Sequence, residues 1–408
     1  MSALFGIEET ILLPMLERLC GDLPRDQLEH RFALATWTGI AEPGDRIAGL
    51  VVTALGASAA LRAIVERRDA EWLLAALTDA GEDSVANDDI VAAIERWQPR
   101  LKASAAVTAL RQAARYSVRL HVPGDETWPV SLDDLGPHAP LALWARGNDS
   151  TLATLGRSIA LVGARAATGY GEHVTMEASA GLVDRGYTIV SGAAYGIDGM
   201  AHRAALASAG QTVAFLAGGV DRFYPSGHDA LLTRIVADGA VVSELPCGSP
   251  PTKWRFLLRN RLIAAASLAT IVLEAGSRSG SLNTAGHAAD LGRPLGAVPG
   301  PVTSAASAGC HRLIRDFQAT LVTGPGEMAE LAPLGPIAYE TSSAGGSPER
   351  TRVIDALSTR AARTVDDIAA RSGLSVAGVQ SVLAVLELEG HATENDRGWL
   401  TRADKPSS

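Results

Sequence analysis

The chain has 408 residues, too many for one ordinary hydrophobic core, so two or three domains are expected. It contains no run of about 18 or more apolar residues, which argues against a membrane-spanning helix. The net charge of −9 disfavours a protein that attracts nucleic acid over its whole surface, but residues 1–149 carry −8 and residues 150–335 carry +1, so the middle of the chain can hold a local basic patch.

The three cysteines, Cys20, Cys247 and Cys310, are far apart and odd in number. They fit a reducing compartment better than a disulfide framework, and their spacing is not that of metal ligands. Residues 1–20 carry acids early and no basic segment, which argues against a secretory signal. A cytoplasmic protein without a bound metal is therefore expected.

The first part of the chain is predicted to be helical. Apolar residues recur at helical spacing over 8–19, 69–80 and 89–97, and residues 46–65 indicate a short helix-turn-helix with Gly56 at the turn. We expect a helical N-terminal domain over residues 1–118, of the SAM or helix-hairpin-helix kind. Its many acidic residues favour structural or partner contacts over DNA binding, although DNA contact stays open.

From Ser158 onward, short apolar strands alternate with helices. The strands lack a polar face, as expected when helices cover both sides of a sheet. Repeated strand–helix units predict an α/β fold with a doubly wound, mostly parallel sheet and right-handed crossovers. This domain is expected over residues 119–335, with its lead-in segment 119–147 packed on one edge of the sheet.

The end of the chain predicts a linker and a small third domain. Residues 336–347 are rich in Gly and Ser, and residues 348–402 give three short helices followed by a two-stranded wing, which is a winged-helix pattern. Residues 403–408 are expected to be a tail. The third helix, 375–389, has no Lys or Arg, so protein contact is favoured over reading of a DNA groove.

The segments that follow the predicted strands are rich in glycine and small residues. The carboxyl ends of parallel strands meet at one edge of the sheet, where ligands bind near the switch in strand order. Glycine lets a ligand approach backbone N–H groups, and helix N-termini favour anions. These segments are 163–171, 191–202, 218–227, 246–261 and 274–288.

A nucleotide cofactor fits these segments poorly. The turn after the first strand is GARAATGYG rather than GxGxxG, and the second strand ends at Ser191 and Gly192 with no acid for a ribose hydroxyl. The loop at 276–284 lacks the lysine of a phosphate-binding P-loop. No cofactor is expected.

Catalysis by these segments is possible but less favoured. Asp198 and His202 are four residues apart, and Glu244 and Glu274 end strands, so all four could move protons. Capping and hydrogen bonding at strand ends is the favoured interpretation. A serine nucleophile would lack an obvious base nearby in the sequence.

A nucleic-acid backbone is the third candidate ligand. Residues 247–273 contain no acid, and Lys253 and Phe256 could place a cation and an aromatic ring on one side of a helical turn, the combination used by single-strand binders. Core burial is favoured for Trp254. A solvated helix face remains the alternative for the cations of this segment, Lys253, Arg255, Arg259 and Arg261.

Taken in order, six motifs resemble the DNA-processing protein A family, also called Smf. They are SGAAYGIDGMAHRAAL, GGVDRFYPSG, SELPCGSPP, FLLRNRLIAAAS, EAGSRSGSLNTAGHAADLGRPLGAVPG and GCHRLI, and they cover about 160–315. The resemblance implies an extended Rossmann-like fold without a catalytic reaction. It also implies a homodimer and a single-stranded DNA-binding protein that protects incoming or processed DNA and loads the RecA recombinase in natural transformation.

The resemblance also implies a set of DNA-binding residues. The pocket arginine of the family falls on Arg165, its lysine and stacking aromatic on Lys253 and Phe256, and its glycine/serine loop on residues 276–281. Ala164 and Tyr195 stand where the family usually has a hydroxyl residue and an arginine. The candidate residues are Gly163, Arg165, Gly192, Lys253, Phe256, Arg259, Asn260, Arg261, Gly276, Ser277, Arg278, Ser279, Gly280 and Ser281.

One enzyme class remains an alternative, the nucleotide phosphoribohydrolases that share this Rossmann type. Those enzymes resemble this chain in fold but carry a PGGxGT loop and a catalytic glutamate, whereas the helix expected at 281–292 has no glutamate. A scaffold that binds partners through its terminal domains is a third possibility. Arg278 could bind phosphate, or could pair with Glu274 and brace the turn.

Overall fold

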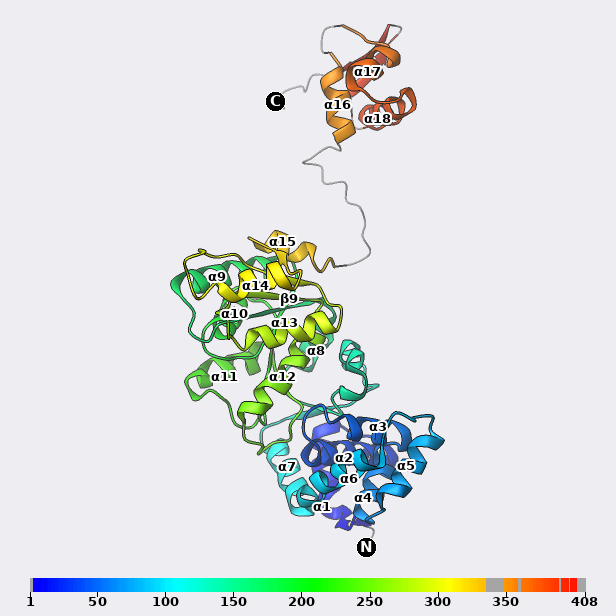
Figure 1. The fold of residues 1–408 in the computed structure, drawn as a ribbon, viewed down its shortest axis with the longest axis vertical. Coiled ribbons are helices and arrows are strands. Elements are labelled where there is room, and N and C mark those ends of the chain that lie inside the picture. Colours follow the sequence, from blue (N-terminus) through cyan, green and yellow to red (C-terminus); the bar gives the residue numbers. More distant parts are fainter. Residues whose placement is uncertain (1–2, 335–347, 359–360, 389, 396, 402–408) are drawn as a thin grey trace. The chain divides into compact units, whose positions relative to one another are not determined.

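Figure 1 shows the fold of the chain, a computed structural model. The chain separates into two compact units, residues 1–333 and 334–408. The structure describes residues 3–334, 348–358, 361–388, 390–395 and 397–401.

The first unit begins with a bundle of short helices. The helix-turn-helix expected at 46–65 is present: α3 and α4 meet at Gly56, where the chain bends by 111°. The side chain of Asp45 caps α3. The elements are β1 (Ala3–Leu4), β2 (Ile7–Glu8), α1 (Glu9–Cys20), α2 (Arg25–Ile40), α3 (Arg46–Leu55), α4 (Ala57–Val65), α5 (Ala70–Asp79), α6 (Asn87–Trp97), η1 (Gln98–Arg100) and α7 (Ala103–Arg115).

A nine-stranded sheet follows in the order β11-β10-β9-β5-β6-β7-β8-β4-β3. Its strands are parallel except β4 and β3, which pair antiparallel on the β8 edge. The predicted doubly wound, mostly parallel sheet is confirmed, with the lead-in segment on an edge. The strands are β3 (Arg119–His121), β4 (Leu143–Gly147), β5 (Ser158–Gly163), β6 (Thr188–Ser191), β7 (Thr212–Phe215), β8 (Ala240–Ser243), β9 (Ala269–Glu274), β10 (Leu295–Ala297) and β11 (Thr320–Leu321).

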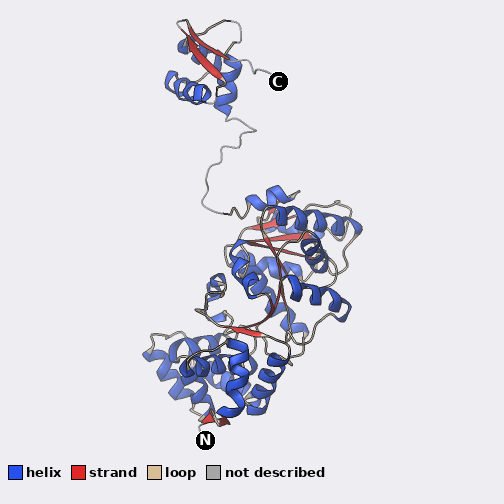
Figure 2. Ribbon diagram, turned by 180° about the vertical axis from the view of Figure 1, so that it is seen from behind, coloured by secondary structure: helices blue, strands red, loops and turns tan. Residues whose placement is uncertain are grey.

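Helices cover both faces of the sheet (Figure 2). Within β5, Ile159 and Leu161 pack with α9, α10 and α15, while Ala160 and Val162 pack with α12, α13 and α14, so every second residue enters the same core. The remaining elements are η2 (Val130–His138), α8 (Asp149–Ala153), η3 (Thr154–Arg157), α9 (Gly169–Asp184), α10 (Ile197–Ala207), η4 (Ser226–His228), α11 (Asp229–Asp238), α12 (Lys253–Ala265), α13 (Ser281–Asp290), α14 (Ala308–Asp316) and α15 (Pro325–Glu330).

The helical region, residues 1–118, shares a hydrophobic core with the sheet. Phe32 of α2 belongs to the same buried cluster as Leu216 and Val241 beside β7 and in β8. Trp144 of β4 is buried there as well, and its indole N–H donates to the hydroxyl of Thr38 at 3.1 Å. The helical region and the sheet therefore form one compact unit.

The second unit is a winged helix, as predicted. It has its own core, formed by residues such as Val353, Ile368, Leu383 and Trp399. The expected linker 336–347 and tail 403–408 lie outside the described residues. Its elements are α16 (Pro348–Ala356), α17 (Val365–Ser372), α18 (Val376–Leu388), β12 (Ala392–Asn395) and β13 (Gly398–Thr401).

Within the described residues, no single helix is both long and apolar enough to cross a membrane. In each of two helix pairs, α3 with α4 and α17 with most of α18, the two helices joined end to end would have the length and apolar composition of a membrane span. These pairs are bent by 111° and 106°.

Candidate nucleic-acid interface

A pocket of about 620 Å³ lies at the switch in strand order. β5 is flanked by β6 on one side and by β9 on the other, so the chain reverses direction across the sheet at this point. The segments that leave β5 and β9 diverge here and line the pocket together with α12. We call it the switch-point pocket, and its size is typical of small-molecule and nucleotide sites.

Eleven of the fourteen candidate residues line this pocket. They are Gly163, Arg165, Phe256, Arg259, Asn260, Gly276, Ser277, Arg278, Ser279, Gly280 and Ser281. The other three, Gly192, Lys253 and Arg261, do not line it. Segments separated by more than a hundred residues are therefore brought to one place by the parallel sheet.

The mouth of the pocket combines an aromatic ring with cations. The ring of Phe256 is half-buried, and the guanidinium carbons of Arg165 and Arg259 lie 5.3 Å and 5.9 Å from its centroid. Arg165 and Arg278 are exposed, so both can reach a ligand. The arrangement offers an aromatic surface between positive charges, which suits a base and its phosphates.

Arg259 lies beneath this surface and is buried. Its guanidinium donates to the carbonyl oxygens of Gly192, at 2.7 Å, and Phe215. The carboxylate of Asp198 accepts from the backbone N–H of Gly192 at 3.2 Å and of Ala194 at 3.4 Å. Arg259 thus ties the ends of β6 and β7 to α12.

Burial and charge oppose one another in this pair. Burial lowers the pKa of Arg259 to about 10, although the Asp198 carboxylate acts to raise it. Burial also raises the pKa of Asp198, against the opposite pull of Arg259 and of backbone N–H groups. At neutral pH Arg259 keeps its proton and supplies a fixed positive charge behind the pocket.

Gly192 is required by this arrangement. A Cβ at position 192 would lie 2.4 Å from the guanidinium nitrogens of Arg259, which is far closer than van der Waals contact. Gly192 therefore makes room for the arginine rather than for the pocket contents.

Asn260 braces the glycine/serine loop. Its side-chain amide donates to the carbonyl of Gly280 at 3.4 Å and to the side-chain oxygen of Asn283 at 3.1 Å. The hydroxyls of Ser279 and Ser281 lie 2.8 Å apart. The loop is thereby held against α12, with the first turn of α13 following it.

Glu274 braces the turn that leads into α9. Its two carboxylate oxygens accept from Thr168, one from the backbone N–H at 2.8 Å and the other from the hydroxyl at 2.6 Å. Thr168 in turn caps α9. The alternative in which Arg278 pairs with Glu274 is not the arrangement seen, and the Arg278 side chain is exposed at the pocket.

The cations of α12 are divided among different partners. Lys253 is the first residue of the helix and is exposed beyond the pocket lining. Arg261 is buried, and its guanidinium bonds the Glu244 carboxylate at 2.7 Å and the His138 carbonyl at 2.9 Å. Arg261 therefore lies away from the pocket and joins α12 to the end of β8 and to η2.

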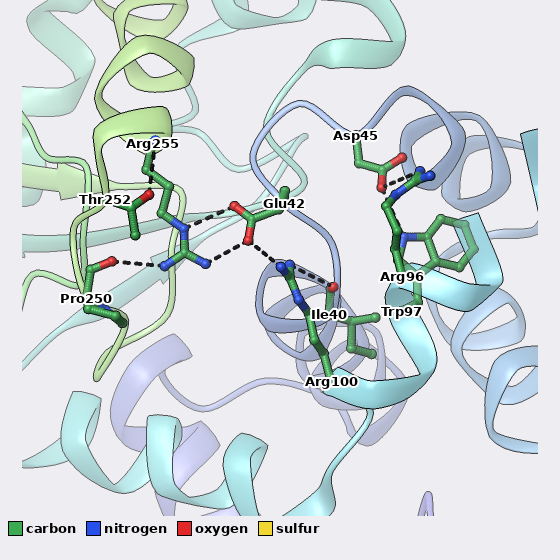
Figure 3. A network of polar contacts seen from close by, with 9 residues as sticks. All are labelled: Ile40, Glu42, Asp45, Arg96, Trp97, Arg100, Pro250, Thr252 and Arg255. Carbon is green, nitrogen blue, oxygen red and sulfur yellow. Dashed lines mark hydrogen bonds and ion pairs between the residues drawn. The ribbon is translucent and has the colours of Figure 1, made fainter. Parts of the chain in front are cut away.

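Arg255 reaches the helical region instead of the pocket, as Figure 3 shows. Its guanidinium makes two bonds to the Glu42 carboxylate, at 3.0 Å and 2.8 Å, and Arg100 approaches the same carboxylate at 2.7 Å. Burial alone would raise the pKa of Glu42, but the bonds and charges of the two arginines lower it overall. Glu42 thus stays ionised and links α12 to the helices.

Two of the potential catalytic side chains, His202 and Ser191, make hydrogen bonds within the protein. His202 is fully buried, and its Nδ1 lies 2.7 Å from the hydroxyl of Thr212. Ser191 donates to the carbonyl of Leu161 at 2.6 Å. Among the described residues, no group of three or more His, Cys, Asp or Glu side chains could hold a metal ion.

One aromatic residue lies differently from the sequence interpretation, and a second was not considered there. Trp254, for which core burial was favoured, is 63% exposed, so that interpretation is wrong. It stands at the first turn of α12, beyond the helix face that enters the core. Tyr224 was not singled out, yet its ring centroid lies 5.5 Å from that of Phe256. Its place in a segment that follows a parallel strand was the available signal.

Comparison with known proteins identifies a family. Residues 119–333 match the family model described as DNA recombination-mediator protein A, and residues 338–395 match that of the DprA winged helix domain. A putative DNA processing protein DprA of Mycobacterium tuberculosis is 48% identical over 297 residues, covering 69% of this chain and 76% of that protein. Protein Smf of Escherichia coli is 38% identical over 272 residues, covering 64% and 71%.

A solved structure shows the same fold. The X-ray structure of DNA processing protein A from Streptococcus pneumoniae matches with a TM-score of 0.57 and 30% identity, covering 73% of this chain and 95% of that one. The family model alone spans more than half of the chain. With its doubly wound sheet, its switch-point pocket and its winged helix, this chain is a member of the DNA recombination-mediator protein A family, also known as DNA-processing protein A or Smf.

Proposed function

We propose that this protein binds single-stranded DNA in the switch-point pocket. The observation that carries the proposal is the half-buried ring of Phe256, which has the exposed guanidinium of Arg165 5.3 Å and the buried guanidinium of Arg259 5.9 Å from its centroid. A base can reach such a ring only when it is unstacked, which favours single strands over duplex. Membership of a family of DNA-processing proteins supports the same conclusion.

Each part of the pocket has a role in this proposal. The exposed guanidinium groups of Arg165 and Arg278 neutralise phosphates, and Phe256 stacks on a base. The loop 276–281 offers backbone N–H groups near the N-terminus of α13, where the helix dipole favours an anion. Lys253 attracts the strand from the rim. None of these contacts reads a base edge, so little sequence preference is expected.

We infer the cellular role from what the family resemblance implies. The protein protects incoming or processed single-stranded DNA in the cytoplasm and loads the RecA recombinase on it in natural transformation or recombination, acting as a homodimer. Faster assembly of RecA filaments on strands already coated by a competing single-strand binder would support this role. No acceleration by a protein that binds DNA normally would contradict it.

A binding role rather than a catalytic one is supported by the state of the carboxylates. Asp198 is buried and accepts from the backbone N–H groups of Gly192 and Ala194, and both oxygens of Glu274 are taken by Thr168. The helix α13 carries no glutamate. Release of free base from nucleoside monophosphates would overturn this part of the proposal.

The proposal is tested by salt-titrated binding of labelled single- and double-stranded oligonucleotides. The wild-type protein should bind single strands more tightly than duplexes. The logarithm of its binding constant should fall linearly with the logarithm of the salt concentration. Arg165→Ala should weaken binding at low salt and reduce the slope by about 0.7, the value for one lost phosphate contact on a single strand. This change tests the role of Arg165 in electrostatic capture.

A matched control is Arg234→Ala. Arg234 is an exposed arginine in the second half of α11. This half of the helix leads into the start of β8, so Arg234 lies toward the amino ends of the strands, whereas the pocket lies at their carboxyl ends. The Arg234→Ala change should leave unchanged both the affinity for single strands and the slope of affinity against salt concentration. Equal behaviour of the Arg165 and Arg234 variants would remove Arg165 from the DNA path.

A further inference from the structure

Tyr224 presents a second aromatic surface beside the switch-point pocket. It lies in the segment that follows β7, and its ring is tilted by 51° to that of Phe256 with centroids 5.5 Å apart. Its side chain is 50% exposed. Within the described part of the chain, its hydroxyl makes no hydrogen bond, so no polar contact explains the orientation of the ring.

The loop that carries Tyr224 is held in place on both sides. Before it, the carboxylate of Asp221 accepts from the backbone N–H of Gly248 at 2.8 Å. After it, the Nδ1 of the buried His228 lies 3.0 Å from the carbonyl oxygen of Ala193. The ring is therefore presented by an anchored loop, and a ligand that contacts it avoids much of the entropic cost of ordering the surface.

Phe256 alone offers limited room for stacking. Its ring is half-buried and is already approached by the guanidinium groups of Arg165 and Arg259. A strand that places one base at Phe256 must direct its neighbouring base elsewhere. The adjacent exposed ring is that of Tyr224, which lies within the reach of consecutive stacked bases.

Resting on the proposed function, we propose that Tyr224 is a second stacking platform for single-stranded DNA. The base at Phe256 enters the pocket mouth, and the neighbouring base stacks on Tyr224, so the strand leaves the pocket over the loop 218–228. Every base has an aromatic face, so this subsite adds affinity without adding sequence preference. The ligand is thus a strand longer than one nucleotide.

The test compares Tyr224→Ala and Tyr224→Phe with wild type on a length series of labelled oligothymidylates. The alanine variant should bind long strands about 5-fold more weakly or worse, as expected for one lost base–aromatic contact, and should bind a mononucleotide as wild type does. The phenylalanine variant should match wild type, because the hydroxyl has no partner. Trp72→Ala removes a 39%-exposed ring of α5 and should change nothing.

Two further measurements separate stacking from other effects. The salt slope should be unchanged in Tyr224→Ala, since a lost ring releases no counterions. An abasic nucleotide can be placed at each position of the strand in turn. At one position it should weaken binding to the wild-type protein but cause no further loss of binding to the alanine variant.

Each alternative outcome has a definite meaning. If wild type binds single strands and Tyr224→Ala matches it at every length, Tyr224 is not a platform. If the variant loses affinity equally for mononucleotides and long strands, Tyr224 only supports Phe256, and the inference is again wrong. Absence of any single-strand binding by wild type would instead overturn the proposed function itself.

Discussion

At the scale of single residues, the buried imidazole of His202 is held in its neutral form. The hydroxyl of Thr212 donates to the carbonyl of Ile189 at 2.8 Å, so its oxygen accepts the proton on Nδ1 of His202 at 2.7 Å. The ring is buried in α10, and burial lowers its pKa to about 3, helped by the charges of nearby His228 and Arg259. His202 is therefore a structural, uncharged residue.

This burial predicts a specific acid sensitivity. The unfolded chain binds a proton at His202 near pH 6.5, whereas the folded chain does so only near pH 3, so stability is lost as pH falls through this window. Between pH 6.5 and pH 5 the loss from this group should be about 1–2 kcal/mol. Urea unfolding at the two pH values should show that His202→Asn, whose amide can replace the Nδ1 donor, loses less stability than wild type.

The control is His173→Asn, since His173 is exposed on α9. Its acid sensitivity should equal that of wild type. If the His202 variant also follows the wild-type curve, protonation of His202 is not what destabilises the fold between these pH values.

At the scale of elements, the turn between α2 and α3, residues 41–45, holds α12 at two points. Glu42 pairs with Arg255, as described above. Less than two helical turns further along α12, the guanidinium of Arg261 bonds Glu244. The Glu244 carboxylate also accepts from the backbone N–H of Gly44 at 3.3 Å. The turn thus sets the position of the helix that carries Phe256.

Glu42→Gln should therefore destabilise the protein. The variant leaves the partly buried Arg255, and the exposed Arg100 beside it, without a carboxylate. The loss of the Arg255 contact is expected to cost about 1–3 kcal/mol of unfolding free energy. Glu29→Gln is the matched control, because Glu29 pairs with the well-exposed Arg62, and such pairs contribute little. Thermal or urea unfolding of both variants measures the difference. Equal stability of the two would show that the Glu42 network does not hold α12.

Much of the fold, and part of the site, followed from sequence. The strands were predictable because short apolar runs without a polar face occur only where both sheet faces are covered. The meeting of the loops at 163–165 and 276–281 followed from parallel topology. The contacts of Arg255 and Arg261 could not be predicted from the sequence. Their partners, Glu42 and Glu244, lie 213 and 17 residues away along the chain, in other elements of the fold.

At the scale of the whole molecule, the two compact units differ in how their parts depend on one another. The winged helix has its own hydrophobic core, whereas the helical region shares one with the sheet through residues such as Phe32 and Val241. Independent folding is thus expected for the winged helix but not for the sheet without its helices.

Two truncations test this difference. A chain ending at Pro333 should keep its unfolding transition and its affinity for single strands, because the pocket lies wholly within residues 162–306. A chain beginning at residue 119 should fold poorly, since it would expose the apolar surface that α2 covers. Circular dichroism and oligonucleotide binding report both. A well-folded sheet without the helical region, or loss of binding without the winged helix, would contradict these expectations.

The core shared by the helical region and the sheet has a consequence for sequence evolution and for protein engineering. Thr38 with Trp144, and Glu42 with Arg255, are matched pairs whose members sit on opposite sides of the junction. A change in one member is expected to select for a compensating change in the other, so relatives should vary these positions together. A chimaera that takes its first 118 residues from one relative and its sheet from another should need both pairs from the same parent.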